Sequence, residues 1–270
     1  MRYFAGIDMG STAIKIALMD EEGTPAGRTV APTGSHFQKN TLAALGLLLQ
    51  EKSIDRSDVA YVLSTGYGRK LFHDADETVS EITANAAGAR AIVGSDGVRT
   101  IINIGGQDSK VLLLDADGQV RNFVMNDKCA AGTGRFLEMT ARNLGAEVDE
   151  LGELHHHCTA APLSITSTCT VFAESEIISL LANGHGREEI VAGVHYSIAR
   201  RIVRLARRIG IEDSVFFDGG PALNSGMVAA LEDELMRKVT VPALPQFTTA
   251  IGAAALARAA WIETREQVNA

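Results

Sequence analysis

The sequence is poor in cysteine, aromatic residues and long hydrophobic runs. Three cysteines in 270 residues are too few for a disulfide framework in a chain of this length. No apolar run approaches the roughly 18 residues that a membrane-spanning helix needs, and Asp8 interrupts the first apolar stretch too early for a secretory signal. We therefore expect a cytoplasmic protein that does not act on a membrane.

The sequence also lacks a surplus of positive charge. Lys and Arg number 25 against 33 Asp and Glu, a net charge of −8, which argues against a nucleic-acid partner. A hydrophobic content of 46% with 21% charged residues excludes a disordered or fibrous chain. The 26 glycines suit tight turns that approach a ligand closely.

Short apolar runs alternate with helix-like segments, which is typical of an α/β protein. The expected strands include 3–7, 14–19, 59–63 and 215–217, and the expected helices are about 41–49, 83–93, 130–144, 170–182, 188–209 and 249–261.

An internal repeat appears when the chain is shifted by 95 residues. The segment GIDMGSTAIKIALMDEEG then aligns with IINIGGQDSKVLLLDADG, so that Gly10 falls on Gly105 and Lys15 on Lys110. Both segments are typical of a strand, a glycine turn, a second strand and an acidic turn. The repeat predicts a duplicated α/β unit with a boundary near Ser95–Arg99. We expect one lobe at 1–96, a second at 97–249, and a C-terminal helix at about 250–270 that packs back on the first.

Each copy of the repeat offers a loop suited to phosphate, because backbone N–H donors with little side-chain bulk lie beside a carboxylate. The candidate residues are Asp8, Gly10, Ser11 and Thr12 in the first loop, and Gly105, Gly106, Gln107 and Asp108 in the second. Facing each other, two such loops would hold the phosphates of a nucleotide. No P-loop motif and no convincing dinucleotide fingerprint is present.

A third glycine turn follows the strand at 215–217. Asp218, Gly219 and Gly220 precede a segment ending in Asn224 that opens a helix. Glycines there would let an adenosine lie against the backbone. Turns of this kind are also common between strands and helices that bind no ligand.

Two of the cysteines, Cys129 and Cys169, stand at the start of expected helices. A helix N-terminus stabilises a thiolate or an anionic cluster bound by thiolates. Two thiols cannot complete a four-thiolate iron–sulfur site, whereas two chains related by a two-fold axis could. The alternative is that they are small buried hydrophobes. Cys158 follows the run His155–His157, which we interpret as a polar turn, and His195 is expected to be an ordinary solvent or capping residue.

Seven segments occur in one order across nearly the whole chain: GIDMGSTAIK, STGYGR, IGGQDSK, NDKCAAGTGRF, STCTVFAESE, GGPALN and AIGAA. This set resembles the activator ATPases of 2-hydroxyacyl-CoA dehydratases, which belong with the ATPase subunits of class I benzoyl-CoA reductases. The resemblance implies the duplicated two-lobed ATPase fold of acetate and sugar kinases, heat-shock chaperones and actin.

The resemblance also implies cofactors. Two chains would share one 4Fe-4S cluster, bound by Cys129 and Cys169 of each, with Cys158 a spectator. ATP or ADP with magnesium would lie between the lobes, with Asp8 or Asp108 orienting the attacking water. The other implied nucleotide contacts are Lys15, Gly132, Thr133, Gly134, Arg135, Gly219, Gly220, Asn224, Gln246 and Gly252, beside the two phosphate loops.

The activity implied by the resemblance is ATP-driven electron delivery. A ferredoxin or flavodoxin would reduce the cluster, and ATP hydrolysis would lower the potential at which the electron passes to a dehydratase. One alternative is the electron-activating ATPase subunit of an aryl-CoA reductase, in a pseudo-symmetric heterodimer. A small-metabolite kinase and an actin-type scaffold ATPase are two more.

Overall fold

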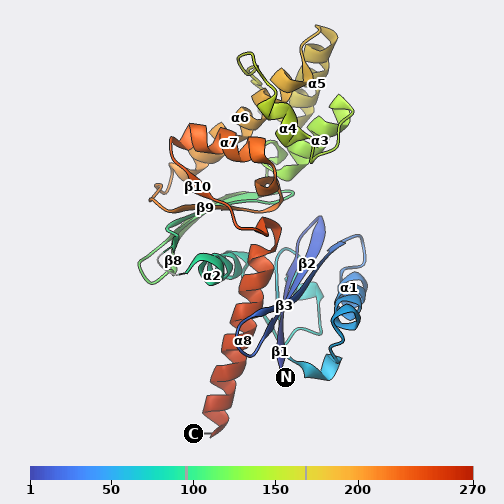
Figure 1. Cartoon of the computed structure of the whole chain (residues 1–270), viewed down its shortest axis with the longest axis vertical. Coiled ribbons are helices and arrows are strands. Elements are labelled where there is room, and N and C mark those ends of the chain that lie inside the picture. The colour runs from blue at the N-terminus through green and yellow to red at the C-terminus, as the bar shows by residue number, and fades with distance from the viewer. Residues whose placement is uncertain (95–96, 168, 270) are drawn as a thin grey trace. The chain divides into compact units, whose positions relative to one another are not determined.

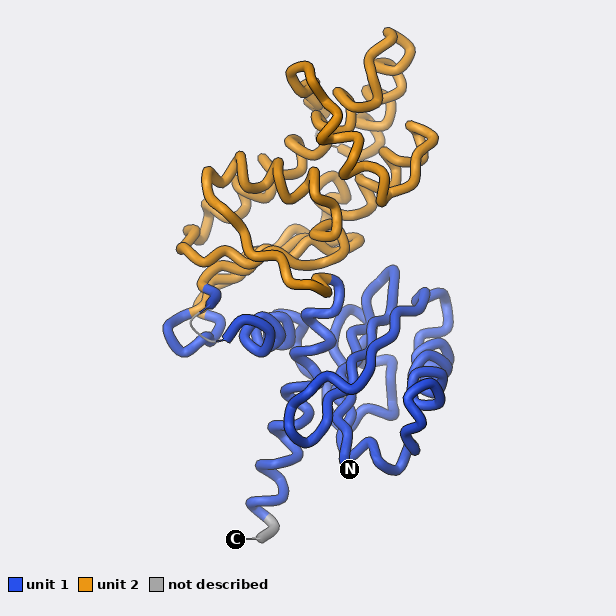
Figure 2. The backbone as a smooth tube through the Cα atoms, in the orientation of Figure 1, with its two compact units in different colours: residues 1–98, 115–120, 246–270 blue, residues 99–114, 121–245 orange. Residues whose placement is uncertain are grey.

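The computed structural model describes residues 1–94, 97–167 and 169–269. It divides into two compact units (Figure 2), unit 1 with Met1–Val98, Asp115–Val120 and Gln246–Ala270, and unit 2 with Arg99–Leu114 and Arg121–Pro245. Unit 2 thus begins at Arg99. Ser95 and Asp96, within the expected boundary, lie outside the described residues. None of the described helices combines the length and apolarity needed to cross a bilayer.

Unit 1 is built on a mixed five-stranded sheet in the order β3-β2-β1-β4-β5. Its strands are β1 (Tyr3–Met9), β2 (Ala13–Asp20), β3 (Pro25–Pro32), β4 (Val59–Thr65) and β5 (Glu77–Thr78). β1, β2 and β3 form antiparallel hairpins, and β4 runs parallel to β1. At the β2–β3 turn, Gly23 adopts a φ of 87° that other residues rarely tolerate.

Helices lie on both faces of the unit 1 sheet (Figure 1). They are α1 (Phe37–Lys52), α2 (Glu81–Val93) and α8 (Thr248–Asn269), with 3₁₀ turns η1 (Arg56–Asp58), η2 (Arg69–Leu71) and η6 (Pro245–Phe247). Alternate β1 residues such as Ile7 pack with α1 on one face, and Phe4 packs with α8 on the other. The period of two along β1 therefore supplies both faces of the core.

Three glycines allow α8 to pack against its neighbours at backbone distance. A Cβ at Gly6 would lie 2.1 Å from the carbonyl oxygen of Ala250, and one at Gly252 would lie 1.8 Å from that of Ala84. The Cβ of an alanine at Gly88 would meet the Thr248 carbonyl at 1.9 Å. Gly252, expected beside adenine, is therefore a packing residue at the α2–α8 crossing.

Unit 2 contains a second five-stranded sheet, ordered β10-β9-β6-β7-β8. Its strands are β6 (Thr100–Ile104), β7 (Ser109–Leu114), β8 (Val120–Asn126), β9 (Val215–Asp218) and β10 (Val239–Thr240). Its helices are η4 (Ala130–Gly132), α3 (Gly134–Leu144), α4 (Leu151–His156), α5 (Thr170–Ala182), α6 (Arg187–Ala206), η5 (Gly220–Leu223) and α7 (Ser225–Leu235). The core of this unit joins β6, β7 and β9 to α3, α6 and α7.

The repeat at offset 95 is confirmed by the strand pairing. Asp8 pairs with Lys15 in the β1–β2 hairpin, and Asn103 pairs with Lys110 in the β6–β7 hairpin. β4 is parallel to β1 as β9 is parallel to β6, so the two sheets share one strand order. The chain is a duplicated α/β structure.

Three local predictions were wrong. The single helix expected at 130–144 is divided into η4 and α3, because Thr133 adopts an extended backbone with φ −138° and ψ 171°. The histidine run is not a solvated turn, since His155 and His156 end α4 and His155 is buried. His195, expected at the surface, is fully buried on α6.

Candidate functional site

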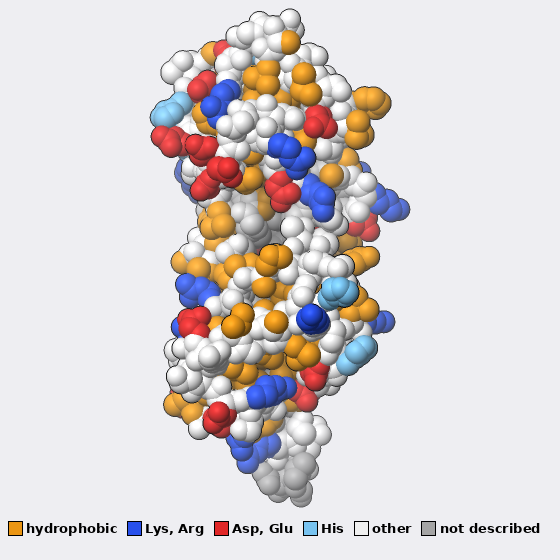
Figure 3. Space-filling view, turned by 90° about the vertical axis from the view of Figure 1, so that its right-hand side faces the viewer, with side chains coloured by type: hydrophobic (Ala, Val, Ile, Leu, Met, Phe, Trp, Pro, Cys, Tyr) orange, Lys and Arg blue, Asp and Glu red, His pale blue; other side chains and the backbone are white. Residues whose placement is uncertain are grey.

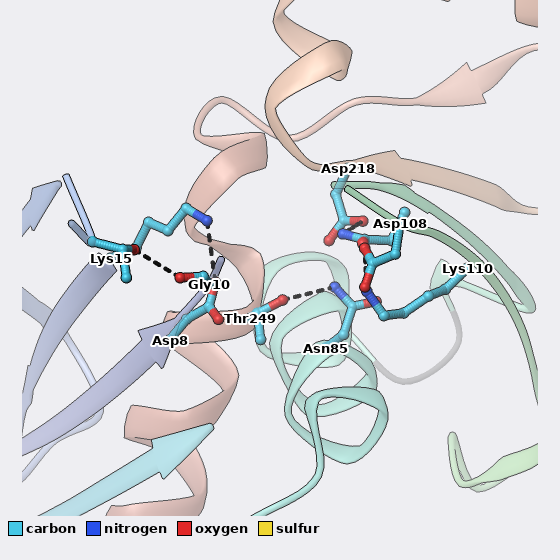
Figure 4. A network of polar contacts seen from close by, with 10 residues as sticks. Asp8, Gly10, Lys15, Asn85, Asp108, Lys110, Asp218 and Thr249 are labelled. Atoms are coloured by element: carbon cyan, nitrogen blue, oxygen red, sulfur yellow. Dashed lines mark hydrogen bonds and ion pairs between the residues drawn. The ribbon is translucent and has the colours of Figure 1, made fainter. Parts of the chain in front are cut away.

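The first glycine loop of unit 1 begins at a nearly buried carboxylate. Asp8 stands near the end of β1 with 6% of its surface exposed, and its Oδ2 lies 3.4 Å from the Lys15 Nζ (Figure 4). This pair follows from the strand register. Ser11 and Thr12 are partly or fully exposed in the turn, so the loop presents small polar groups and backbone beside the pair.

Neighbouring segments fix the position of this loop. The Thr33 hydroxyl donates to the Gly10 carbonyl at 2.7 Å. Gly66, with φ 86°, lies so close to Asp8 that its Cβ would be 2.5 Å from the carboxylate oxygen. The preceding Thr65 hydroxyl is buried and, among the described residues, has no hydrogen-bond partner. Sequence reasoning used STGYGR only for the resemblance, although its paired glycines could have marked it as part of this site.

The second loop, in unit 2, is closed by its own backbone. The Gly105 N–H donates to the Asp108 carbonyl at 2.9 Å. The Asp108 carboxylate lies 2.8 Å from the Lys110 Nζ, and that lysine is only 2% exposed (Figure 4). Gln107 at the tip is exposed. Both loops therefore combine a carboxylate, a lysine of the second hairpin strand and accessible residues in the turn.

The third glycine turn contains a buried aspartate that sequence reasoning left out of the site. Asp218 is fully buried at the end of β9, and its Oδ1 accepts from Asn103 Nδ2 at 2.8 Å (Figure 4). Gly219 has φ 94°, and a Cβ there would lie 2.1 Å from the Ile104 carbonyl. Around Gly220 the space is open. The sequence could have indicated this part of the site, because Asn103, the partner of Asp218, aligns with Asp8 in the repeat at offset 95.

Asn224 is the N-cap residue of α7. Its Oδ1 caps α7 by accepting from the Met227 N–H at 2.9 Å, and its Nδ2 lies 3.3 Å from His195 Nε2. The His195 Nδ1 is in turn 3.1 Å from the His155 Nδ1. Burial, with smaller contributions from His155 and His156, lowers the pKa of His195 to about 3. Asn224 is therefore held by a neutral imidazole pair.

Cys129 begins the segment that touches the second phosphate loop. It is the half-buried residue before η4, and the Asn126 side chain donates to its carbonyl at 2.8 Å. Gly134 and Arg135 open α3, and their N–H groups donate to the carbonyls of Gly105 and Gly106 at 2.8 and 3.0 Å. The phosphate loop and the cysteine-bearing turn are thus hydrogen-bonded neighbours.

Cys169 is the exposed residue that precedes α5. Glu176, on the second turn of α5, accepts from the N–H groups of Thr166 and Ser167 at 3.0 and 2.9 Å. Burial raises the pKa of Glu176, but these hydrogen bonds outweigh it and the pKa falls below its usual value. Glu176 thus holds the segment that leads to Cys169.

One arginine lies between the two cysteine segments. Arg201 of α6 donates from Nη2 to the Ser167 carbonyl at 2.7 Å. Burial lowers the pKa of Arg201, the Cys129 thiol raises it, and the charge of Arg204 lowers it again. Cys129 thus lies near a guanidinium, and Cys169 precedes the N-terminus of α5, which are surroundings typical of metal-binding thiols. The two thiols therefore fit the chemistry of an iron–sulfur ligand.

The remaining candidates are less distinctive. Cys158 is half-buried, and its thiol donates to the Ala160 carbonyl at 3.2 Å. Gln246 lies half-buried in η6 of unit 1. Across residues 1–94, 97–167 and 169–269, no group of three or more His, Cys, Asp and Glu side chains is arranged to hold a metal ion.

Comparison with known proteins finds relatives that match nearly the whole chain. The chain is 46% identical over 255 residues to the activator of lactoyl-CoA dehydratase from Anaerotignum propionicum, covering 93% of this chain and 96% of the other. The activator of 2-hydroxyisocaproyl-CoA dehydratase from Clostridium difficile, solved with bound ADPNP, superimposes with a TM-score of 0.93 at 42% identity over 98% and 97% of the two chains.

The fold extends beyond these relatives. A ROK family glucokinase from Streptomyces griseus superimposes with a TM-score of 0.60 at 15% identity, over 95% and 99% of the two chains. This likeness confirms the kinase-like ATPase fold, and at 15% identity it supports no conclusion about function. Residues 5–257 match the BadF/BadG/BcrA/BcrD ATPase family. With its duplicated sheets, paired glycine loops and cysteine-bearing turns, the chain belongs to that family of ATPases.

Proposed function

We propose that the chain hydrolyses ATP in order to drive an electron to a 2-hydroxyacyl-CoA dehydratase. The loops at Gly10–Thr12 and Gly105–Gln107 bind the phosphates through backbone N–H groups. Asp8 and Asp108 are the catalytic carboxylates, which orient the attacking water directly or through magnesium. Lys15 and Lys110 hold these carboxylates in place, at 3.4 and 2.8 Å.

The observation that carries the proposal is the pair of backbone hydrogen bonds from Gly134 and Arg135 to the second phosphate loop. The same short segment begins at Cys129 and continues into α3. A shift of Gly105 and Gly106 when the γ-phosphate is lost is therefore passed to the cysteine turn through two direct bonds. Gly132, Thr133 and Gly134 belong to this connection, which supports their assignment to the nucleotide site.

Cys129 and Cys169 are the proposed ligands of a 4Fe-4S cluster. Such a cluster takes four thiolates and supplies one-electron redox chemistry. One chain contributes two thiols at this site, so a second copy would provide the other two. Arg201 donates to the Ser167 carbonyl between the two cysteine segments, and Glu176 holds the approach to Cys169.

The surface around Cys169 supports a dimer. Val171 and Phe172, which follow it on α5, are each 68% exposed, and Ile178 is 52% exposed. Hydrophobic side chains appear among charged ones on the face shown in Figure 3. Apolar side chains that flank an exposed ligand are a normal composition for the core of an interface. A second copy that completes the cluster would also cover them.

The names of the relatives indicate the acceptor. Two close relatives are activators of CoA-ester dehydratases, so we propose a dehydratase of that class as acceptor and a ferredoxin or flavodoxin as donor, both in the cytoplasm. Gly219, Gly220 and Asn224 form the adenosine end of the proposed nucleotide site, with Gln246 as a further contact.

Anaerobic purification of the full chain tests the proposal. We expect a brown homodimer with one cluster for two chains and with ATPase activity. A heterodimer with a related subunit would instead indicate an aryl-CoA reductase. Iron-free protein that phosphorylates a small metabolite at full rate would overturn the proposal in favour of a kinase.

A further inference from the structure

Unit 2 contains a recess of about 280 Å³ beside the C-terminal half of α6. Its polar lining comes from Ser109, Asn126 and three arginines, Arg201, Arg204 and Arg208, with Cys129 at one side. No aspartate or glutamate is among the residues that line it. A recess with three positive charges and no negative ones suits an anionic ligand.

The arginines reach the recess because of their spacing. Positions 201, 204 and 208 are three and four residues apart, so they lie on one side of α6 and of the turn that follows it. Arg204 and Arg208 are exposed, and neither forms an ion pair within the part of the chain that the structure describes. Their guanidinium groups are therefore available to a ligand, whereas the nearby Arg200 is paired with Glu234 at 3.7 Å.

Ser109 supplies an independent sign of a ligand. Its side chain is fully buried, lines the recess, and its hydroxyl has no hydrogen-bond partner among residues 1–94, 97–167 and 169–269. Leaving a buried hydroxyl unpaired costs about 1–3 kcal/mol. A ligand oxygen in the recess would remove that cost.

Gly132 also lines the recess, but the floor at Ser109 faces away from the carboxylate of the second glycine loop. Side chains alternate along β7, so Ser109 and Val111 point to one face and Lys110 to the other. Val111 packs in the core with α6 residues such as Ile202, whereas Lys110 pairs with Asp108 of the phosphate loop. The hydroxyl of Ser109 therefore lies on the α6 side of the sheet, away from the proposed catalytic carboxylate.

We propose that this recess binds the phosphate monoester of a small metabolite. Arginine forks bind phosphate oxygens in bidentate fashion, and the Ser109 hydroxyl contributes one more hydrogen bond at the floor. The volume exceeds that of several water molecules, so it holds the phosphate together with part of the group that it esterifies. The site goes beyond the proposed function, since neither ATP hydrolysis nor cluster binding requires Arg204, Arg208 or the Ser109 hydroxyl, although Cys129 and Gly132 also line the recess.

Calorimetry on the full chain, anaerobically purified and saturated with ADP so that the nucleotide site is filled, tests the proposal. The probes are glycerol 3-phosphate and inorganic phosphate. We expect wild type to bind glycerol 3-phosphate more tightly than inorganic phosphate. The double variant Arg204→Gln/Arg208→Gln should weaken binding of the monoester ten-fold or more, and Ser109→Ala should weaken it several-fold.

Arg207→Gln is the matched control, since Arg207 is exposed in the same turn but does not line the recess. It should leave binding unchanged. Three results would overturn the proposal: no binding of either probe to wild type, equal binding to wild type and the double variant, or an equal loss in Arg207→Gln. Tighter binding of inorganic phosphate than of the monoester would contradict the ester assignment. Iron content and ATPase activity report separately on the proposed function.

Discussion

At the scale of single residues, the three cysteines occupy different environments. Cys169 is exposed at a helix N-terminus, Cys129 is half-buried near Arg201, and Cys158 donates to a backbone carbonyl within its own loop. Cys129 and Cys169 each precede a helix, whereas Cys158 follows the C-terminal end of α4. The surroundings of each cysteine, rather than the number of cysteines in the chain, distinguish the proposed ligands from the third thiol.

The first prediction concerns these thiols. Cys129→Ala and Cys169→Ser each remove one ligand per chain, so anaerobically purified protein should lose nearly all its iron and its brown absorbance. Cys158→Ser is the control and should retain both. Full iron content in either ligand variant would show that the assignment is wrong.

The second prediction concerns the proposed catalytic carboxylates. Asp108→Asn removes the negative charge beside the buried Lys110, and the steady-state ATPase rate should fall about a hundred-fold or more. The cluster should remain, because the Asp108 carboxylate pairs with Lys110 and is not a proposed cluster ligand. Asp117→Asn, in the exposed acidic turn, should keep the full rate. Loss of iron together with activity in Asp108→Asn would assign the residue a structural role instead.

At the scale of elements, α2 and α8 pack at a distance that only glycine permits. The third prediction is that Gly252→Ala destabilises the protein by several kcal/mol, because the new Cβ would lie 1.8 Å from the Ala84 carbonyl and the helices must separate. Gly46→Ala, in the exposed interior of α1 with nothing within 4 Å, should stabilise by about 0.5–1 kcal/mol. Urea unfolding measures both. If Gly252→Ala left the free energy of unfolding unchanged, α2 and α8 would have to lie farther apart at their crossing than described.

The buried imidazole pair on α4 and α6 gives a fourth prediction. Burial lowers the pKa of His195 to about 3 and that of His155 below the ordinary 6.5. The unfolded chain therefore takes up these protons first as the pH falls. Stability is full above about pH 6.5 and declines below it, by up to about 1.4 kcal/mol per pH unit for each histidine.

Urea unfolding at pH 7 and pH 5.5 checks this linkage. A His155→Gln/His195→Gln variant should show a smaller loss of stability over that interval than wild type. His157→Gln, on an exposed histidine of the same run, should keep the wild-type dependence. Equal pH dependence in all three proteins would contradict a buried neutral pair.

Element types were predictable wherever the local pattern was strong. The hairpin repeat predicted both glycine loops, because the offset of 95 preserved polarity as well as glycine, whereas the register of Asp8 with Lys15 came only from the structure. Burial of His195 was not predictable, since only tertiary packing of α4 and α7 on α6 encloses it. The break at Thr133 was missed for a related reason, because Gly134 and Arg135 bond to a loop distant in sequence.

At the scale of the whole molecule, the duplicated sheets give each unit its own proposed phosphate loop, and the three cysteines all lie in unit 2. That asymmetry is the basis of the proposed coupling, since only the second loop is bonded to a cysteine-bearing turn. The apolar surface of α5 beside Cys169 fits a second copy of the chain. Energy from the nucleotide and redox chemistry at the thiols would then meet in unit 2 of each subunit.

The spectrum of the reduced protein tests this coupling most directly. Reduced, anaerobically purified protein should be compared by electron paramagnetic resonance with saturating ADP and with a non-hydrolysable ATP analogue, after nucleotide binding has been verified by calorimetry. The account predicts an iron–sulfur signal whose line shape differs between the two nucleotides. Identical spectra with both nucleotides bound would contradict it.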